Sequence, residues 1–265
     1  MRAGSKDTVI AVKLHAPQRG ARCGLGELCL PDAQAAAHAE DRGGFACSHR
    51  RVGRGECLFR AGDPFAWVYP VRLGSFKISV VTAAGCEQVT GFHMRGEIMG
   101  IDGVDAGRHS CSAFALEDSL VCLVPFGLLE EKCTGNRRLQ RQLHRAMSRQ
   151  IDSGQGAMLV LGSMHAEERL AAYLLDLSER YGACGYSRYE FNLRMTREEI
   201  GSFIGLKLET VSRSFSRLQE CKLLSVSGKS VSILDLPGLR QVIGQSDPGL
   251  RERNPHALPP IPPIV

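Results

Sequence analysis

The pattern of hydrophobic and polar positions changes character halfway along the chain. From Pro31 to about Glu131, short apolar runs alternate with glycines at near-regular spacing. Short β-rich runs separated by turn residues are typical of a small β-barrel or jelly roll. The clearest predicted strands are Val68–Val71, Phe76–Val81, Gln88–Phe92 and Leu120–Val124.

Beyond Asn136 the period of the pattern becomes helical. From Arg137 to Leu161, apolar side chains recur at spacings of three, four or seven residues, which predicts a long amphipathic helix with a narrow apolar seam. Such a seam fits either pairing with a second helix or packing against the chain's own barrel. Asp152 lies beside it, where a charge would tune the strength of a dimer. The seam residues are Leu139, Leu143, Met147, Ile151, Met158 and Leu161.

A pair of short helices follows later in the chain. Thr196 and Glu199 have the spacing of a capping box at a helix start, and Gly205 suits the left-handed residue that ends a helix. A second helix with its own apolar stripe comes next, and then a predicted β-hairpin of Leu223–Val226 and Val231–Leu234. Two short helices with a glycine in the turn, followed by a hairpin, indicate a winged helix–turn–helix that binds DNA.

The polar face of the second helix carries side chains that suit nucleic acid. Arginine matches guanine, glutamate accepts from cytosine N4, and serine suits either bases or phosphates. From Lys207 to Lys229, five basic residues stand against two acidic ones, a local excess of three positive charges that favours phosphate contact. The predicted DNA-binding residues are Glu209, Ser212, Arg213, Ser216 and Arg217, together with Thr196 at the start of the first helix.

Composition narrows the class of protein. The 265 residues are 43% hydrophobic and 23% charged with a net charge of +5, which excludes a disordered chain, a collagen and a coiled-coil rod. No apolar run approaches the roughly 20 residues that span a bilayer, and the N-terminus has no signal-peptide core. We therefore expect a cytoplasmic protein with no membrane partner. Its ten cysteines should then stay reduced, as core residues, metal or cluster ligands, or redox sensors.

Four motifs occur in order along the chain: GECLFRAGD at Gly55–Asp63, GFH at Gly91–His93, AEERLAA at Ala166–Ala172 and LETVSR at Leu208–Arg213. Together they resemble the Crp/Fnr superfamily of transcriptional regulators, and specifically its oxygen-responsive Fnr branch. The similarity runs from about residue 23 to about residue 234. It implies an α+β fold with an N-terminal β-roll (jelly-roll) sensory domain, a long dimerisation helix and a C-terminal winged helix–turn–helix.

The resemblance also implies domain boundaries and binding partners. We predict a cysteine-bearing segment (1–30), the β-roll (31–133), the dimerisation helix (134–161), the DNA-binding domain (162–236) and a flexible, proline-rich tail (237–265). By resemblance, a homodimer binds a palindromic site on double-stranded DNA with half-sites like TTGAT, which Glu209, Ser212 and Arg213 read. It then contacts RNA polymerase and regulates anaerobic or redox-responsive genes.

The Fnr branch senses oxygen with a [4Fe-4S] cluster held by three N-terminal cysteines and one in the roll. Cys23, Cys29 and Cys122 stand at three of these ligand positions, but Gly20 stands where the fourth cysteine is expected, and glycine has no side chain to bind iron. Three interpretations follow. A substitute donor such as His15 or another cysteine completes the cluster; a non-protein ligand does so; or the cluster is lost and the N-terminal thiols sense redox state directly.

The remaining chemistry-bearing residues have simpler interpretations. Gly96-Glu97 and Arg108-His109-Ser110 echo a cyclic-nucleotide pocket, but His109 separates the arginine from the serine, which disfavours a phosphate clamp. Haem-dependent nitric-oxide sensors among the relatives generally lack the N-terminal cysteines. No G-x-S-x-G, Walker A or H-E-x-x-H motif indicates an enzyme. We expect the other seven cysteines to be packing residues: Cys47, Cys57, Cys86, Cys111, Cys133, Cys184 and Cys221.

Overall fold

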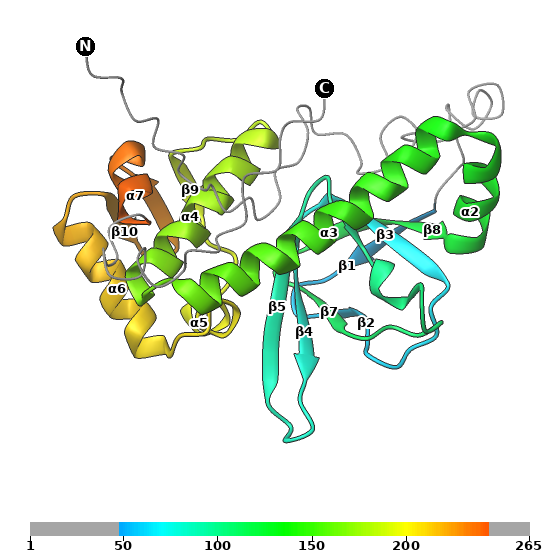
Figure 1. Ribbon diagram of the computed structural model, residues 1–265, viewed down its shortest axis with the longest axis horizontal. Helices are drawn as coiled ribbons and strands as arrows, with labels where there is room; N and C mark the ends of the chain where they lie inside the picture. The colour runs from blue at the N-terminus through cyan, green and yellow to red at the C-terminus, as the bar shows by residue number, and fades with distance from the viewer. Residues whose placement is uncertain (1–47, 244–265) are drawn as a thin grey trace, which may run out of the picture.

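The first half of the described chain consists of short strands, as the alternating pattern predicts (Figure 1). A computed structural model describes residues 48–243 of the chain. The strands pair antiparallel in two four-stranded sheets, ordered β1-β8-β3-β6 and β2-β7-β4-β5. The elements are β1 (Ser48–Val52), β2 (Cys57–Phe59), β3 (Trp67–Leu73), β4 (Ser75–Val81), β5 (Glu87–Met94), β6 (Ile98–Met99), a 3-10 turn (Ile101–Gly103), β7 (Ser112–Ala115) and β8 (Ser119–Pro125).

The two sheets enclose one core and turn a second apolar face toward helices. Phe76, Val71 and Val121 are fully buried between the sheets. Because side chains alternate along a strand, the neighbouring Cys122 faces the other way, into a separate core beneath the helical layer. The tight link between β3 and β4 requires Gly74, because its φ of +90° is left-handed and a Cβ would overlap the side chain of Ser119.

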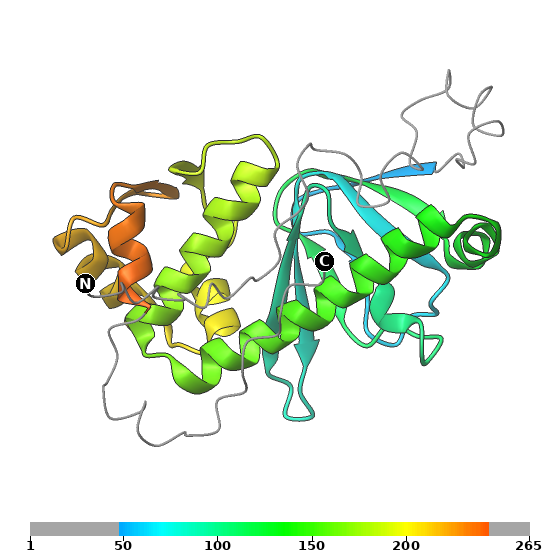
Figure 2. The same ribbon diagram turned by 45° about the horizontal axis from the view of Figure 1, so that its top comes forward.

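Two helices, α2 (Phe126–Gly135) and α3 (Arg137–Ser163), follow the roll. Asn136 caps α3, since its side chain accepts hydrogen bonds from the backbone N–H groups of Arg138 and Leu139 at 3.0 and 3.1 Å. Figures 1 and 2 show α3 crossing the roll diagonally and continuing to the C-terminal helices, so that one helix connects the roll to the C-terminal part of the chain.

The apolar seam of α3 divides into two halves with different surroundings. Leu139 and Leu143 are buried against the roll in the core that holds Cys122, which confirms the packing interpretation for this half. Further along, Ile151 and Met158 are 61% and 76% exposed. The second half of the seam therefore presents apolar side chains to the surface of the chain.

The C-terminal part is the predicted winged helix–turn–helix. Its helices pack around Leu170, Ile200, Phe215 and Leu224, with a three-stranded sheet ordered β10-β11-β9. No helix within residues 48–243 is long and apolar enough to cross a membrane. The elements are α4 (Ala166–Ala183), β9 (Glu190–Asn192), α5 (Arg197–Ile204), α6 (Leu208–Glu220), β10 (Leu224–Ser227), β11 (Ser230–Ile233) and α7 (Leu236–Val242).

The predicted flexible tail from residue 237 is wrong at its beginning. Asp235 caps α7 by accepting a hydrogen bond from Gly238 N at 2.9 Å, and Leu239 is fully buried in the domain core. The helix is short, so its amphipathic period was too weak to detect. The proline-rich residues 244–265 lie outside the described residues.

Candidate DNA-binding and sensory sites

The first helix of the helix–turn–helix begins and ends as predicted. Thr196 Oγ1 accepts a hydrogen bond from Glu199 N at 3.1 Å, and Thr196 N donates to the Glu199 carboxylate at 2.7 Å. Gly205 ends the helix with a φ of 66°, in the left-handed region that favours glycine. These local features fix the residues at which α5 begins and ends, just before the turn into α6.

The predicted recognition residues share the exposed face of α6. Val211, Phe215 and Leu218 are buried on the opposite side. Residues at these spacings lie on one side of an α-helix, so the structure brings five of the six predicted DNA contacts together. Thr196 lies apart, exposed at the start of α5. The α6 set is Glu209, Ser212, Arg213, Ser216 and Arg217, exposed except for Ser212, which is half-buried.

Sequence patterns did not reveal two contacts that hold this face in place. The guanidinium of Arg197 lies 4.2 Å from the ring centre of Phe215, which ties α5 to α6. Arg217 forms an ion pair with Glu167 at the start of α4. Arg217 is therefore engaged within the domain as well as exposed, whereas the structure gives Arg213 an exposed position one turn nearer the helix start.

The wing lies directly after α6. Ser227 and Ser230 close the β10–β11 hairpin, and Gly228 adopts a left-handed φ of 60° in its turn. Lys229 is exposed at the tip. The wing, which follows the recognition helix closely in the sequence, therefore carries a basic side chain.

Cys122 is the predicted cluster ligand that the structure describes, and it is fully buried. It shares a core with Leu139 and Leu143 of α3, and it lies opposite His49 in the pairing of β1 with β8. The first described residue, Ser48, thus lies one residue pair from Cys122. Gly20, Cys23 and Cys29, and the candidate donors His15 and Cys47, lie outside the described residues. Within residues 48–243, no group of three or more histidine, cysteine or acidic side chains could hold a metal ion.

The other described cysteines divide by burial. Cys111, Cys133 and Cys184 are buried, as expected of packing residues, and Cys57 is half-buried. Burial raises the pKa of the Cys133 and Cys184 thiols, which suits inert structural roles. The expectation is wrong for the exposed Cys86 and Cys221, one in the β4–β5 hairpin turn and one after α6. Turn and helix-end positions carry no periodic signal of burial.

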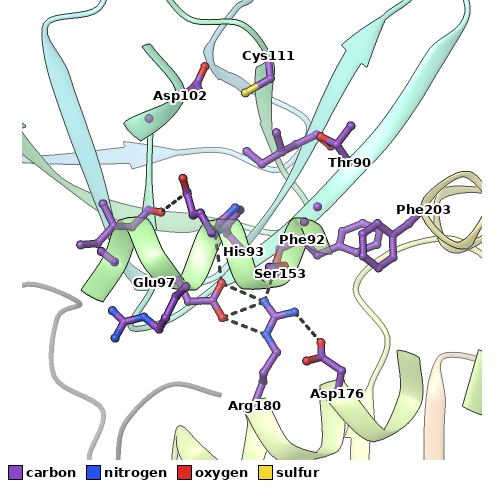
Figure 3. Close-up of a pocket in the computed structure, with 18 of the residues that line it drawn as sticks. Thr90, Phe92, His93, Glu97, Asp102, Cys111, Ser153, Asp176, Arg180 and Phe203 are labelled. Carbon is purple, nitrogen blue, oxygen red and sulfur yellow. Dashed lines mark hydrogen bonds and ion pairs between the residues drawn. The ribbon is translucent and has the colours of Figure 1, made fainter. Parts of the chain in front are cut away.

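A buried ion-pair cluster joins the roll to the DNA-binding domain (Figure 3). Arg180 of α4 makes two parallel bonds to the carboxylate of Glu97, with Nε–Oε1 and Nη2–Oε2 distances of 3.0 Å each. It also donates to Phe92 O at 2.6 Å and to Asp176 at 3.2 Å. His93 Nδ1 lies 3.2 Å from Glu97 Oε2. One arginine thus bridges two carboxylates that belong to different domains.

A cavity of about 240 Å³ lies beside this cluster, between β5, α3 and α4. Glu97 was the candidate acid of a cyclic-nucleotide pocket, but here it is bonded to Arg180 from the other domain. Arg108 instead donates to Gly62 O at 2.8 Å, and His109 is buried with its ring 3.9 Å from that of Phe59. The groups that would clamp a cyclic phosphate are therefore engaged elsewhere.

Two domain families match the chain. A family described as the cyclic nucleotide-binding domain matches residues 49–136, which include most of the roll. The Crp-like helix-turn-helix domain matches residues 168–242, which hold the helix–turn–helix, the wing and α7. Both matches agree with the boundaries at which the architecture changes.

Known proteins are similar over most of the chain. The transcriptional regulatory protein btr of Bordetella pertussis is 45% identical over 223 residues, which are 84% of this chain and 92% of that protein. The transcriptional activator protein anr of Pseudomonas aeruginosa is 44% identical over 213 residues, 80% of this chain and 87% of its own. The solved structure of FixK2 from Bradyrhizobium japonicum has a TM-score of 0.69 at 27% identity, covering 75% of this chain and 98% of that one.

Asp176 should make stability depend on pH. Burial raises the pKa of its carboxyl from 3.8 to about 8, although Arg180 opposes the shift. The folded protein therefore binds a proton that the unfolded chain releases. The free energy of unfolding that this proton contributes is complete below pH 3.8 and is lost as pH rises to about 8. We expect Asp176→Asn, which mimics the protonated acid, to gain on the order of a few kcal/mol relative to wild type between about pH 5 and pH 9.

Urea unfolding at both pH values measures this difference. Asp105→Asn, at an exposed loop position, controls for the loss of a carboxylate. An unchanged gap between Asp176→Asn and wild type across the range would show that Asp176 is ionised in the folded protein.

Proposed function

The chain belongs to the Crp/Fnr family of transcriptional regulators, and we propose that it senses oxygen through an iron–sulfur cluster and binds palindromic DNA as a homodimer. Its place in this family makes it a DNA-binding regulator of anaerobic genes, not an enzyme. The observation that carries the proposal is the exposed recognition face of α6, on a helix–turn–helix attached to the roll that holds Cys122.

DNA recognition rests on the N-terminal half of α6. In a helix–turn–helix, the second helix enters the major groove and its first turns reach the base edges. Glu209, Ser212 and Arg213 are the side chains in those turns, and Arg213 can donate two hydrogen bonds to guanine O6 and N7. Arg217 and Lys229 suit phosphate contacts, and so does the hydroxyl of Thr196, since it can donate while its oxygen caps α5.

Arg213→Ala tests this reading of the site. We expect it to weaken binding to a palindrome of TTGAT half-sites by about 1–3 kcal/mol for each arginine lost, with much less change on unrelated DNA. Fluorescence anisotropy on both DNAs measures the two affinities. Arg54→Ala makes the same charge change at an exposed turn of the roll and should affect neither. Equal losses on every sequence would identify Arg213 as a phosphate contact.

The dimer surface is the second half of α3. Crp/Fnr regulators act as dimers, and this half exposes the apolar side chains Ile151, Met158, Leu159 and Leu161. Exposed apolar patches mark interaction surfaces, and the spacings of seven and three residues between Ile151, Met158 and Leu161 suit a second helix. The first half is covered by the roll on its apolar side and carries Arg137, Arg141 and Arg145 on its exposed side. Like charges there would oppose close pairing.

Ile151→Glu should weaken self-association by about 2 kcal/mol or more, because the dimer would bury two unpaired carboxylates. Analytical ultracentrifugation over a concentration series measures the dimer dissociation constant. Thr134→Glu adds the same charge at an exposed position of α2 and should leave it unchanged. An unaltered dissociation constant for Ile151→Glu would mean that the dimer forms elsewhere.

The cluster would be held by Cys23, Cys29 and Cys122, with a fourth donor in place of Gly20. The resemblance assigns Cys122 as the ligand in the roll, and its side chain faces the core under α3, where it packs with Leu139 and Leu143. A [4Fe-4S] cluster supplies oxygen-sensitive chemistry when bound. Ligation of Cys122 would shift side chains that pack against Leu139 and Leu143, and so bear on the dimerisation helix.

The three interpretations of the fourth cluster ligand differ in what the protein would sense. A side-chain donor such as His15 or another cysteine, or a non-protein ligand, would preserve oxygen sensing. Loss of the cluster would make this a regulator that responds to thiol redox state or to nitric oxide. A cyclic nucleotide is less favoured, because Glu97 is bonded to Arg180. We further propose that the dimer acts in the cytoplasm and contacts RNA polymerase.

Anaerobic purification tests the cluster directly. We expect iron and sulfide in the wild-type protein, with a brown colour that bleaches in air, and loss of both in Cys122→Ser. Cys133→Ser is the matched control, because Cys133 is buried in the same core but is not a predicted ligand. Gly20→Cys should raise iron content or slow bleaching. An anaerobic wild-type protein without iron, and with equal DNA affinity after oxidation, would contradict cluster sensing.

A further inference from the structure

Two lines of contact hold the DNA-binding domain against the roll. The first is the pair Glu97–Arg180, whose side chains are only 3% and 6% exposed. The second runs along β5, an edge strand of its sheet, where Val89 N donates to Ser202 Oγ of α5 at 2.9 Å and Gln88 donates to Ser202 O. Edge strands leave backbone groups unpaired, and α5 supplies the partner of one of them, Val89 N.

These contacts are continuous with an apolar interface. Val89 and Phe92 of β5 belong to the core of the DNA-binding domain, not to that of the roll. The ring centres of Phe92 and Phe203 in α5 lie 5.3 Å apart, and Figure 3 shows the two side chains next to each other. Phe203 also contacts Tyr173 of α4. The first helix of the helix–turn–helix is thereby packed directly on the roll.

The Arg180 bridge sets one orientation in particular. A bidentate arginine–carboxylate pair has strict geometry, unlike a single ion pair. A rotation of the domain that keeps this interface closed would separate Glu97 from Arg180 while both remain buried, which is costly. Only Met164 and His165 separate α3 from α4, so this bridge and the short link together fix α6 relative to α3.

A dimer built on α3 then has a defined distance between its recognition helices. We propose that Arg180 and Glu97 are positioning residues that set the half-site spacing accepted by the dimer. The inference rests on the proposed function, because spacing has meaning only for a dimer on a palindrome. Dimeric helix–turn–helix proteins read half-sites about one helical turn apart, and a loosely held domain would tolerate other separations.

Affinity for a spacing series tests the proposal. The full-length anaerobic protein is titrated on palindromes of TTGAT half-sites with the preferred spacer and with one base pair added or removed. We expect Arg180→Gln to reduce the preference for the preferred spacer by about tenfold, because a charged buried pair is lost. Arg213 still reads each half-site, so binding to single half-sites should not change.

A second variant guards against misfolding of the first. Ser202→Ala removes one interdomain hydrogen bond without leaving a charge buried, and should reduce the preference about threefold. Arg240→Gln is the control, since its ion pair with Glu179 at 3.6 Å lies within the DNA-binding domain. It should keep the wild-type preference.

The outcomes distinguish failure of the positioning role of Arg180 and Glu97 from failure of the proposed function. If Arg180→Gln and Ser202→Ala lose affinity equally on all spacers, the residues only stabilise the domain and the inference is overturned. A gain of affinity for the preferred site would also overturn it, because the docked orientation would then be the inactive one. If wild type shows no preference for a palindrome at all, the proposed function itself fails.

Discussion

The arrangement of this protein depends on a guanidinium buried between two domains. Arg180 pairs with the Glu97 carboxylate on the roll and donates a hydrogen bond to Asp176 on its own helix, and Glu97 could not be buried as a carboxylate without it. Because one cation faces two acids, burial dominates at Asp176 and raises its pKa. The position of the DNA-binding domain on the roll therefore depends on a few side-chain atoms in this cluster.

The long helix α3 connects the sensory and DNA-binding functions because its two halves have different partners. Its first half covers the core in which Cys122 is buried, so a change at that thiol reaches the helix through packed side chains. Its second half exposes the apolar residues that suit a second copy. Its end leads within two residues to α4, which carries Arg180. A single helix thus touches the roll, the proposed dimer surface and the DNA-binding domain.

Local features of this fold were predictable from the sequence because they arise from neighbours along the chain. The capping box of Thr196 and Glu199, the left-handed Gly205 and the stripes of α6 all involve residues within a few positions of one another. The exposed recognition residues follow from the same period. The prediction was wrong where no local signal exists, as at the short helix α7 and at the exposed cysteines Cys86 and Cys221.

The sequence by itself determined the order of roll, long helix and winged helix–turn–helix, and the side chains that α6 can offer to DNA. Only the tertiary structure decided which half of the α3 seam is buried and which acid Arg180 meets. Glu97 and Arg180 are 83 positions apart, and Val89 and Ser202 are 113 apart. Neither contact has a periodic signature, because such pairs form only when separately folded elements pack together. The orientation of the DNA-binding domain is therefore a property of packing, whereas its recognition chemistry is a property of one helix.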